Sequence, residues 1–195
     1  MPPKKRIFRE DILNAALDII RRGGVQALTV RTIAGELSCS TQPVYSEFGS
    51  LDALKEELPS YAAKRYLHFS AGSYKDFALG FLRFAQTEKE LFKFLYLRRR
   101  GPGETLLDDA NYEETVMLLQ RNLEMSEQDA REMHRRMQFQ CYAMGVMMAT
   151  DYLELSEEQI GRELTDFYRI MLRHYKSVQS DEELRYWLDR SRHLI

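Results

Sequence analysis

Hydrophobic residues recur at intervals of three or four along most of the chain, which is the spacing of one face of an α-helix. Such a stripe runs from Ile12 to Ile20, and Gly23-Gly24 follows it as a stop signal. Two shorter segments come next, from Leu28 to Leu37 and from Thr41 to Phe48. No stretch alternates between polar and apolar residues for long enough to predict a β-strand. The pattern therefore predicts an all-α fold.

The rest of the chain carries longer helical segments. We predict them near residues 51–58, 60–71, 74–87, 89–98, 106–124, 127–153, 157–177 and 181–193. Pro59 is expected to kink or separate the first two, and Gly101-Pro102-Gly103 predicts a loop. Ser156 and Ser180 each open a capping-box pattern, so we expect a helix to begin after each of them.

The two short segments near the N-terminus fit a helix-turn-helix arrangement. This arrangement needs a small residue where the helices cross, an apolar residue in the turn and an apolar anchor on the second helix. Ala34, Cys39 and Val44 stand at compatible positions. Thr29 is placed to cap the first of the two helices. The segment is therefore predicted to form a three-helix unit with its own small core.

The second short helix is predicted to expose a polar face. Thr41, Gln42 and Ser46 lie outside its anchored face, and a glutamine amide can pair with an adenine edge in the major groove. Ser40 or Thr41 can cap the helix, and Pro43 then falls in its first turn, where the missing N–H matters least. The plain alternative is an ordinary solvated helix face.

Charge is distributed unevenly along the chain. The whole sequence holds 28 Lys+Arg against 30 Asp+Glu, a net charge of −2. Residues 1–48 carry a net charge of +2 and the remaining residues −4. A local positive excess suits phosphate contact. Because this excess is small, we expect DNA affinity to come from paired subunits and shaped contacts rather than from bulk charge.

Composition narrows the setting of the protein. The two cysteines, Cys39 and Cys141, are too few for a disulfide framework and fit a reducing cytosol. The longest charge-free run, Met137 to Thr150, has 14 residues, whereas a membrane span needs roughly 20. The N-terminus does not resemble a signal peptide. We therefore expect a cytoplasmic protein that has no membrane partner.

Motifs of catalysis and metal binding are absent from the sequence. No histidine has an acidic residue three positions away, and no Cys-x-x-Cys, Walker A or dinucleotide-binding glycine pattern occurs. We predict no catalytic residues, no metal site and no cofactor. Cys141 lies in an apolar stretch and is expected to be a packing residue, with a thiol sensor as the alternative.

A set of positions in the N-terminal part of the chain stands in a specific order and spacing. They are Ile12-x-x-Ala15-Ala16, Gly24, Leu28-Thr29-Val30-Arg31-Thr32-Ile33-Ala34, Ser40, Val44-Tyr45, Phe48 and Leu54. Over roughly residues 7–55 this pattern resembles the DNA-binding domain of the TetR family of transcriptional regulators (TetR/AcrR-like). The resemblance implies that residues 1–50 form a helix-turn-helix DNA-binding domain. It also implies that residues 51–195 form a larger helical domain that binds an effector and dimerises.

The resemblance also implies roles for individual residues. Thr29 and Arg31 would contact the phosphate backbone, Thr41 and Gln42 would read bases, and Tyr45 would donate its hydroxyl to a phosphate. An alternative for Tyr45 is simple packing against Ile33. The predicted DNA-binding residues are Thr29, Arg31, Ser40, Thr41, Gln42, Pro43, Tyr45 and Ser46.

Two positions depart from the family pattern. A glycine is common where Gln42 stands, so a side-chain contact would replace close backbone approach. A lysine that often serves a phosphate is common where Leu51 stands. Its loss would shift that contact to the arm from Lys4 to Arg9.

Two further sets of residues are predicted in the larger domain. Aromatic residues in the middle of the chain are either core or the lining of a cavity for a flat or lipophilic molecule. The predicted ligand-binding residues are Tyr66, Phe69, Phe81, Phe84, Tyr96, Met117 and Tyr142. The methionine-rich stretch 127–153, paired with 157–177, is either buried core or half of an intersubunit four-helix bundle. The predicted dimer-interface residues are Met144, Met148, Leu164, Tyr168, Met171 and Tyr175.

Together these features predict a homodimeric TetR-like regulator, with a repressor role relieved by a small lipophilic or aromatic effector. Its partner would be double-stranded operator DNA with a pseudo-palindromic sequence, and its half-sites would lie about 34–36 Å apart or a multiple of that. One alternative is a DNA-binding regulator that responds to a protein partner and has no small-molecule effector. Another is a helical enzyme or carrier that keeps the fold without binding DNA.

Overall fold

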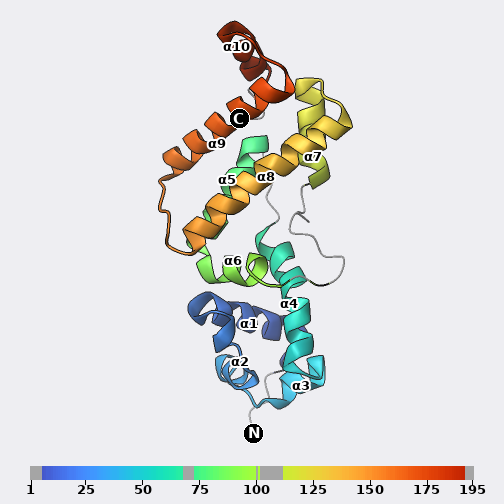
Figure 1. The fold of residues 1–195 in the computed structure, drawn as a ribbon. Coiled ribbons are helices and arrows are strands. Elements are labelled where there is room, and N and C mark those ends of the chain that lie inside the picture. The colour runs from blue at the N-terminus through green and yellow to red at the C-terminus, as the bar shows by residue number, and fades with distance from the viewer. Residues whose placement is uncertain (1–5, 68–72, 100, 102–111, 192–195) are drawn as a thin grey trace. The chain divides into compact units, whose positions relative to one another are not determined.

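The computed structural model describes residues 6–67, 73–99, 101 and 112–191, and every regular element within these ranges is a helix (Figure 1). This confirms the predicted all-α fold. The chain packs as two compact units. Unit 1 comprises residues 1–66 and 88–99, and unit 2 comprises residues 67–87 and 100–195.

Unit 1 contains the N-terminal helices and one helix from later in the sequence. Its helices are α1 (Arg9–Gly23), the 3₁₀ turn η1 (Val25–Ala27), α2 (Val30–Glu36), α3 (Gln42–Phe48), α4 (Leu51–Tyr66) and α6 (Lys89–Tyr96). The packing therefore divides the chain elsewhere than at the predicted boundary, residue 50. The physical reason is that α4 packs on α1 and α3, and that α6 packs on α1 and α4.

The core of unit 1 follows the predicted stripe of α1. Ile12, Ala16 and Ile20 are completely buried. Helix α1 ends at Gly23, and Gly24 adopts a positive φ of 73°, as the predicted stop signal requires. A Cβ atom at Gly24 would lie 2.8 Å from a carboxylate oxygen of Glu90, but this is the end of a flexible side chain, so the positive φ is what requires a glycine there.

Helix α4 runs without interruption from Leu51 to Tyr66, although Pro59 lies inside it. The expected separation into two helices at this proline is therefore wrong. Proline removes one backbone hydrogen bond from a helix. Leu54, Leu58 and Ala62 are completely buried on one face of α4. Their burial holds the parts of α4 before and after Pro59 against the rest of unit 1.

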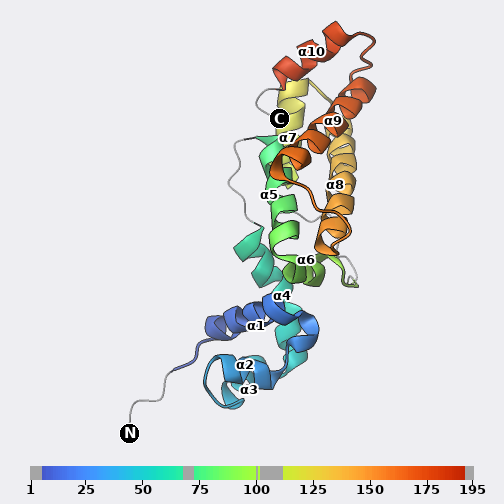
Figure 2. The same ribbon diagram turned by 90° about the vertical axis from the view of Figure 1, so that its left-hand side faces the viewer.

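Unit 2 contains α5 (Tyr74–Thr87), α7 (Tyr112–Leu123), α8 (Glu127–Ala149), α9 (Glu157–Tyr175) and α10 (Asp181–Arg190). Helices α5, α8 and α9 pack side by side, α7 lies along α8, and α10 packs on α7 and α9 (Figures 1 and 2). None of the described helices is long and apolar enough to cross a membrane.

The helix starts in unit 2 show how far capping patterns predict structure. At α9 the Gln159 N–H donates to the Ser156 hydroxyl at 3.2 Å, and the Ser156 N–H donates to the Gln159 side chain at 2.7 Å. This confirms that capping box. At α10 the Ser180 hydroxyl accepts from the Glu183 N–H, but the Glu183 carboxylate accepts from the N–H of Gln179 instead. The predicted box there is half formed.

Some predicted helix ends differ from the structure. Helix α8 ends at Ala149 and not near residue 153. Asp151 has a positive φ of 60°, and the Tyr152 N–H donates to the Met147 carbonyl at 2.9 Å, which closes the helix with a turn. The predicted starts and ends near residues 71, 106 and 193 lie outside the described residues.

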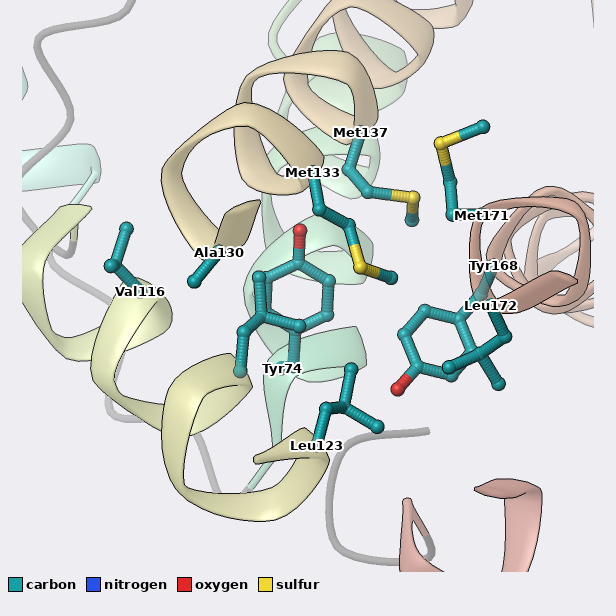
Figure 3. Close-up of a cluster of buried hydrophobic side chains, with 10 residues drawn as sticks. Tyr74, Val116, Leu123, Ala130, Met133, Met137, Tyr168, Met171 and Leu172 are labelled. Atoms are coloured by element: carbon teal, nitrogen blue, oxygen red, sulfur yellow. The ribbon is translucent and has the colours of Figure 1, made fainter. Parts of the chain in front are cut away.

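A hydrophobic cluster fills the middle of unit 2. Tyr74 of α5 and Tyr168 of α9 point into it between methionine side chains of α8 and α9 (Figure 3). The buried members are Tyr74, Val116, Leu119, Leu123, Ala130, Met133, Met137, Tyr168, Met171 and Leu172. Methionine is unbranched and polarizable, so this core can fill irregular space between aromatic rings.

A short polar chain crosses the same region. The Thr115 hydroxyl donates to the Tyr112 carbonyl at 2.8 Å and lies 3.2 Å from Nε2 of His134. Because the hydroxyl hydrogen points to the carbonyl, the hydroxyl oxygen accepts from Nε2–H. In the neutral imidazole, Nδ1 is then the acceptor, and the Tyr74 hydroxyl donates to it at 3.2 Å. These hydrogen bonds join α5, α7 and α8 through one buried histidine.

We expect Tyr74→Phe to lower the free energy of unfolding by roughly 1–3 kcal/mol, because it removes the O–H donor to a buried nitrogen. Chemical denaturation of the two proteins measures the difference. Tyr152→Phe is the matched control, since Tyr152 is 82% exposed, and it should change stability by less than about 0.5 kcal/mol. Equal effects of the two substitutions would contradict a stabilising role for the Tyr74 hydroxyl.

Candidate nucleic-acid interface

Helix α2 begins with a reciprocal cap. The Thr32 N–H donates to the Thr29 hydroxyl at 3.1 Å, and the Thr29 N–H donates to the Thr32 hydroxyl at 2.9 Å. The predicted cap at Thr29 is confirmed. After α2 the chain turns through Ser38, which has a φ of 52°, and the Cys39 N–H donates to the Ala34 carbonyl at 2.9 Å. These contacts fix the turn that leads into α3.

Helix α3 is anchored by its apolar side. Val44 and Phe48 are buried, Ala34 of α2 is buried, and α2 packs on α3. The predicted anchor is therefore confirmed, and the predicted crossing residue is buried. Cys39 in the turn is only half-buried. With both of its anchors on one side, α3 presents its other side to solvent.

The solvent side of α3 carries Gln42, Tyr45 and Ser46, all of which are exposed. Tyr45 is 50% exposed, so half of its surface is available to a partner. The Gln42 amide donates to the Ser46 hydroxyl at 3.3 Å, one helical turn away. The face therefore combines an amide, an aliphatic hydroxyl and a phenol within two turns of helix.

The remaining predicted DNA-binding residues surround this face in the sequence. Thr29, Arg31 and Ser40 are exposed, whereas Thr41 and Pro43 are half-buried. The predicted side-chain cap of α3 at Ser40 or Thr41 is wrong. Thr41 is the N-cap residue, but its backbone is helical and its side chain forms no cap hydrogen bond. A capping side chain generally needs an extended backbone at that position.

Most basic side chains of α1 are occupied inside unit 1. Arg21 pairs with Glu88 at 2.7 Å and Arg22 with Glu36 at 2.5 Å. Arg9 pairs with Glu57. In the predicted Lys4–Arg9 arm, Arg9 is therefore engaged with an acid, whereas exposed Arg6 forms no ion pair. Lys4 and Lys5 lie outside the described residues. Hydrogen bonding to Glu57 raises the pKa of Arg9 further above its already high ordinary value.

Several basic side chains of unit 1 stay available for contact with a polyanion. In the described part of the chain, those that form no ion pair include Arg6, Arg31 on α2 and Lys55 on α4. Sequence reasoning missed Lys55. The sequence could have indicated it, because Lys55 stands four residues after Leu51, where the family pattern has a lysine. That spacing places Lys55 one turn further along the same helix.

The charge of the two units is more unequal than the sequence division at residue 48 indicated. Unit 1 holds 14 Lys+Arg and 10 Asp+Glu, a net charge of +4, whereas unit 2 holds 14 and 20, a net charge of −6. The segment 88–99, which contains α6, accounts for the larger positive value, because residues 49–66 add no net charge. Unit 1 is therefore the part of the chain suited to a polyanionic partner.

The predicted ligand-binding residues do not form one set. Tyr66 and Tyr96 belong to unit 1, where the Tyr66 hydroxyl accepts from Arg21 at 2.8 Å and the Tyr96 ring lies against Phe92. In unit 2, Phe84 is buried, Phe81 and Tyr142 are half-buried, and Met117 is 59% exposed. Met117 therefore does not line the interior of unit 2. Phe69 lies outside the described residues.

The predicted dimer-interface residues need correction. Met144, Met148, Leu164, Tyr168 and Met171 are buried inside unit 2 itself, in its two hydrophobic clusters, and Tyr175 is half-buried. A side chain with almost no exposed surface has little left to bury against a second subunit. The large apolar side chains that α8 and α9 expose are Phe139, at 52%, and Ile170, at 58%.

The two cysteines lie in different surroundings. Burial raises the pKa of the Cys141 thiol to about 12, so it stays protonated at neutral pH and suits packing better than redox sensing. We expect iodoacetamide to label half-buried Cys39 roughly 100-fold faster than Cys141 in the folded protein. Mass spectrometry of digested samples measures the two rates, and a denatured sample is the control. Equal rates in the folded protein would contradict the burial of Cys141.

Among the described residues, no group of three or more His, Cys, Asp and Glu side chains could hold a metal ion.

No protein-family model and no curated protein sequence matches the chain. A solved structure does match it, that of a TetR-like transcriptional regulator from Rhodococcus sp. RHA1. The TM-score is 0.57 and the sequence identity 17%, over 87% of this chain and 98% of the other. The chain therefore shares the fold of this TetR-like regulator.

Proposed function

We propose that the chain is a DNA-binding transcriptional regulator of the TetR type, which reads operator DNA with α3. One observation carries the proposal. Helix α3 is anchored by buried Val44 and Phe48 and exposes Gln42, Tyr45 and Ser46, in a unit of net positive charge. The fold shared with a TetR-like regulator supports the same function.

Each exposed side chain has a chemical role in this proposal. Gln42 pairs with adenine through its amide oxygen and nitrogen, and Ser46, hydrogen-bonded to it, orients the amide. The Tyr45 hydroxyl donates to a backbone phosphate. Arg31 and Lys55 contribute charge to further phosphates.

A homodimer places two copies of α3 on one duplex. Paired helices then contact a pseudo-palindromic operator with half-sites about 34–36 Å apart, or a multiple of that spacing. We assign the interface to the exposed sides of α8 and α9, which carry Phe139 and Ile170. Two copies of such a helix pair form a four-helix bundle.

Repression and its relief by an effector complete the proposal. The core of unit 2 contains Met133, Met137 and Met171 around aromatic rings, and methionine side chains adapt to the shape of a lipophilic or aromatic guest. The dimer has one conformation that spans both half-sites and another that does not. An effector relieves repression if it binds the second conformation more tightly than the first. Two free cysteines suit a protein that works in the reducing cytoplasm.

Selection of bound sequences from a pool of random duplex DNA tests the proposal directly. We expect enrichment of an inverted repeat whose half-sites are spaced by one helical turn or a multiple of it. Enrichment of single half-sites would contradict the dimeric arrangement. No enrichment over the starting pool would contradict the function itself.

A further inference from the structure

The side chain of Arg9 joins three helices of unit 1. Arg9 is the first residue of α1, and its guanidinium carbon lies 3.9 Å from the centre of the Phe48 ring at the end of α3. The same guanidinium donates to the backbone carbonyl of Glu47 on α3. It also donates to both carboxylate oxygens of Glu57 on α4, with Nε at 3.3 Å from Oε1.

The electrostatics of α1 do not favour a positive charge at its first residue, Arg9. A positive charge at a helix N-terminus is disfavoured by the helix dipole, whereas a positive charge at a C-terminus is favoured. Arg9 stands at the N-terminus of α1 and, through Glu47, at the C-terminus of α3. The last carbonyl groups of a helix lack partners within the helix, so this guanidinium satisfies one of them. The favourable interactions of Arg9 are therefore with α3 and with Glu57 of α4.

The shape of arginine suits this combination of contacts. A planar guanidinium can stack its face on an aromatic ring while its edges donate hydrogen bonds in fixed directions. Here the face covers Phe48, one edge meets a carbonyl and another meets a carboxylate. A lysine ammonium is a compact charge that has no planar surface to stack on a ring and no paired N–H donors in fixed directions. It cannot make all three contacts together.

Helix α3 needs external support. It has seven residues, far fewer than an isolated helix needs for stability in water. Its N-cap residue, Thr41, provides no side-chain hydrogen bond. Its anchors are Val44 in the middle and Phe48 at the last position. The end of α3 near Phe48 is where Arg9 acts.

We propose that Arg9 is a positioning residue for DNA recognition, which holds the C-terminal end of α3 against α1 and α4 and contacts no phosphate itself. The Arg9 side chain is 44% exposed, but its guanidinium already donates hydrogen bonds to Glu47 and Glu57. The effect of Arg9 on DNA binding rests on the proposed function. Its effect on the order of α3 does not depend on that function.

Three variants of the full-length protein separate positioning from charge. Arg9→Gln removes the positive charge. Arg9→Lys keeps the charge but loses the planar guanidinium with its paired N–H donors. Glu57→Gln removes the carboxylate that holds Arg9 in place. Glu56→Gln is the matched control, because it removes the same charge from the adjacent residue of α4, which is exposed.

Two measurements are made on each variant: hydrogen–deuterium exchange of peptides that cover residues 42–49, and affinity for the selected operator as a function of salt. We expect faster exchange in α3 for all three test variants, with exchange in α9 unchanged as a control for global unfolding. We expect operator affinity to fall about five- to thirtyfold in each of them. The slope of log affinity against log salt concentration should stay the same.

The variant Glu57→Gln gives the sharpest distinction. Removal of an acid from the DNA-binding unit should strengthen binding if only overall charge matters, as we expect for Glu56→Gln. Positioning predicts that Glu57→Gln weakens binding. A salt slope smaller by about one in Arg9→Gln, with normal binding by Glu57→Gln, would overturn the proposal and make Arg9 a phosphate contact.

Exchange in α3 that does not change in any of the three variants would also overturn the proposal. If the wild-type protein bound no duplex DNA, the proposed function would fail. The exchange measurements would still show whether Arg9 holds α3, so the two failures can be distinguished.

Discussion

Replacement of both Gln42 and Tyr45 with alanine should reduce specific operator binding roughly 100-fold or more, and the variant should remain folded and dimeric. A bidentate side-chain contact to a base contributes about 1–3 kcal/mol of discrimination, and a dimer makes each contact twice. Both side chains are exposed on α3, so their removal leaves the core around Val44 and Phe48 intact.

Fluorescence anisotropy with labelled operator and with a scrambled duplex measures specific and nonspecific affinity. The matched control is Gln128→Ala combined with Tyr152→Ala, the same pair of changes at exposed positions of unit 2. We expect this control to bind like the wild type, and nonspecific binding to persist in both variants because the cations are unchanged. Operator affinity that survives the loss of Gln42 and Tyr45 would remove α3 from the binding site.

Substitution of both Phe139 and Ile170 with glutamate should convert the dimer into a folded monomer. These are the large apolar side chains that α8 and α9 expose. A carboxylate buried without a partner in an apolar interface costs several kcal/mol, and the two-fold axis doubles the number of such groups. Light scattering at micromolar concentration measures the mass, and circular dichroism measures the helix content.

The contrasting variant is Leu164→Ala, taken from the interface that the sequence predicted. Leu164 is buried inside unit 2, so its truncation should lower the free energy of unfolding by about 2–5 kcal/mol and should not selectively dissociate the dimer. A Phe139 and Ile170 variant that remains dimeric would place the interface elsewhere. Dissociation of stably folded Leu164→Ala would restore the interface predicted from the sequence.

Features that depend on residues close together in the sequence could be predicted. The stripe of α1, the stop at Gly24, the cap at Thr29 and the capping box at Ser156 are all present in the structure. Helical hydrogen bonds and caps join residues that are three or four positions apart, so their patterns are visible in the sequence. The exposed side of α3 follows for the same reason, once Val44 is recognised as its anchor.

Predictions about surfaces were less successful, because burial depends on which helices pack together. The methionine-rich face of α8 carries the apolar pattern of either a core or an interface, and that pattern is the same in both cases. In the structure α5 covers this face, so Met144 and Met148 belong to the core and Phe139 remains exposed. The expected separation at Pro59 failed for a related reason, since the burial of its neighbours Leu54 and Leu58 outweighs one lost hydrogen bond.

By itself, the sequence determined that this protein is all-helical, and it predicted a short helix near the N-terminus that exposes Thr41, Gln42 and Ser46. In the structure Gln42 and Ser46 are exposed together with Tyr45, whereas Thr41 is half-buried. Only the tertiary structure decided that α6 joins the N-terminal unit, which thereby reaches a net charge of +4. Only the tertiary structure showed that Arg9 is hydrogen-bonded to Glu47 of α3 and Glu57 of α4. Side-chain periodicity is a local property of the chain, whereas the partners of a charged side chain lie tens of residues away in the sequence and become known only when the helices are packed.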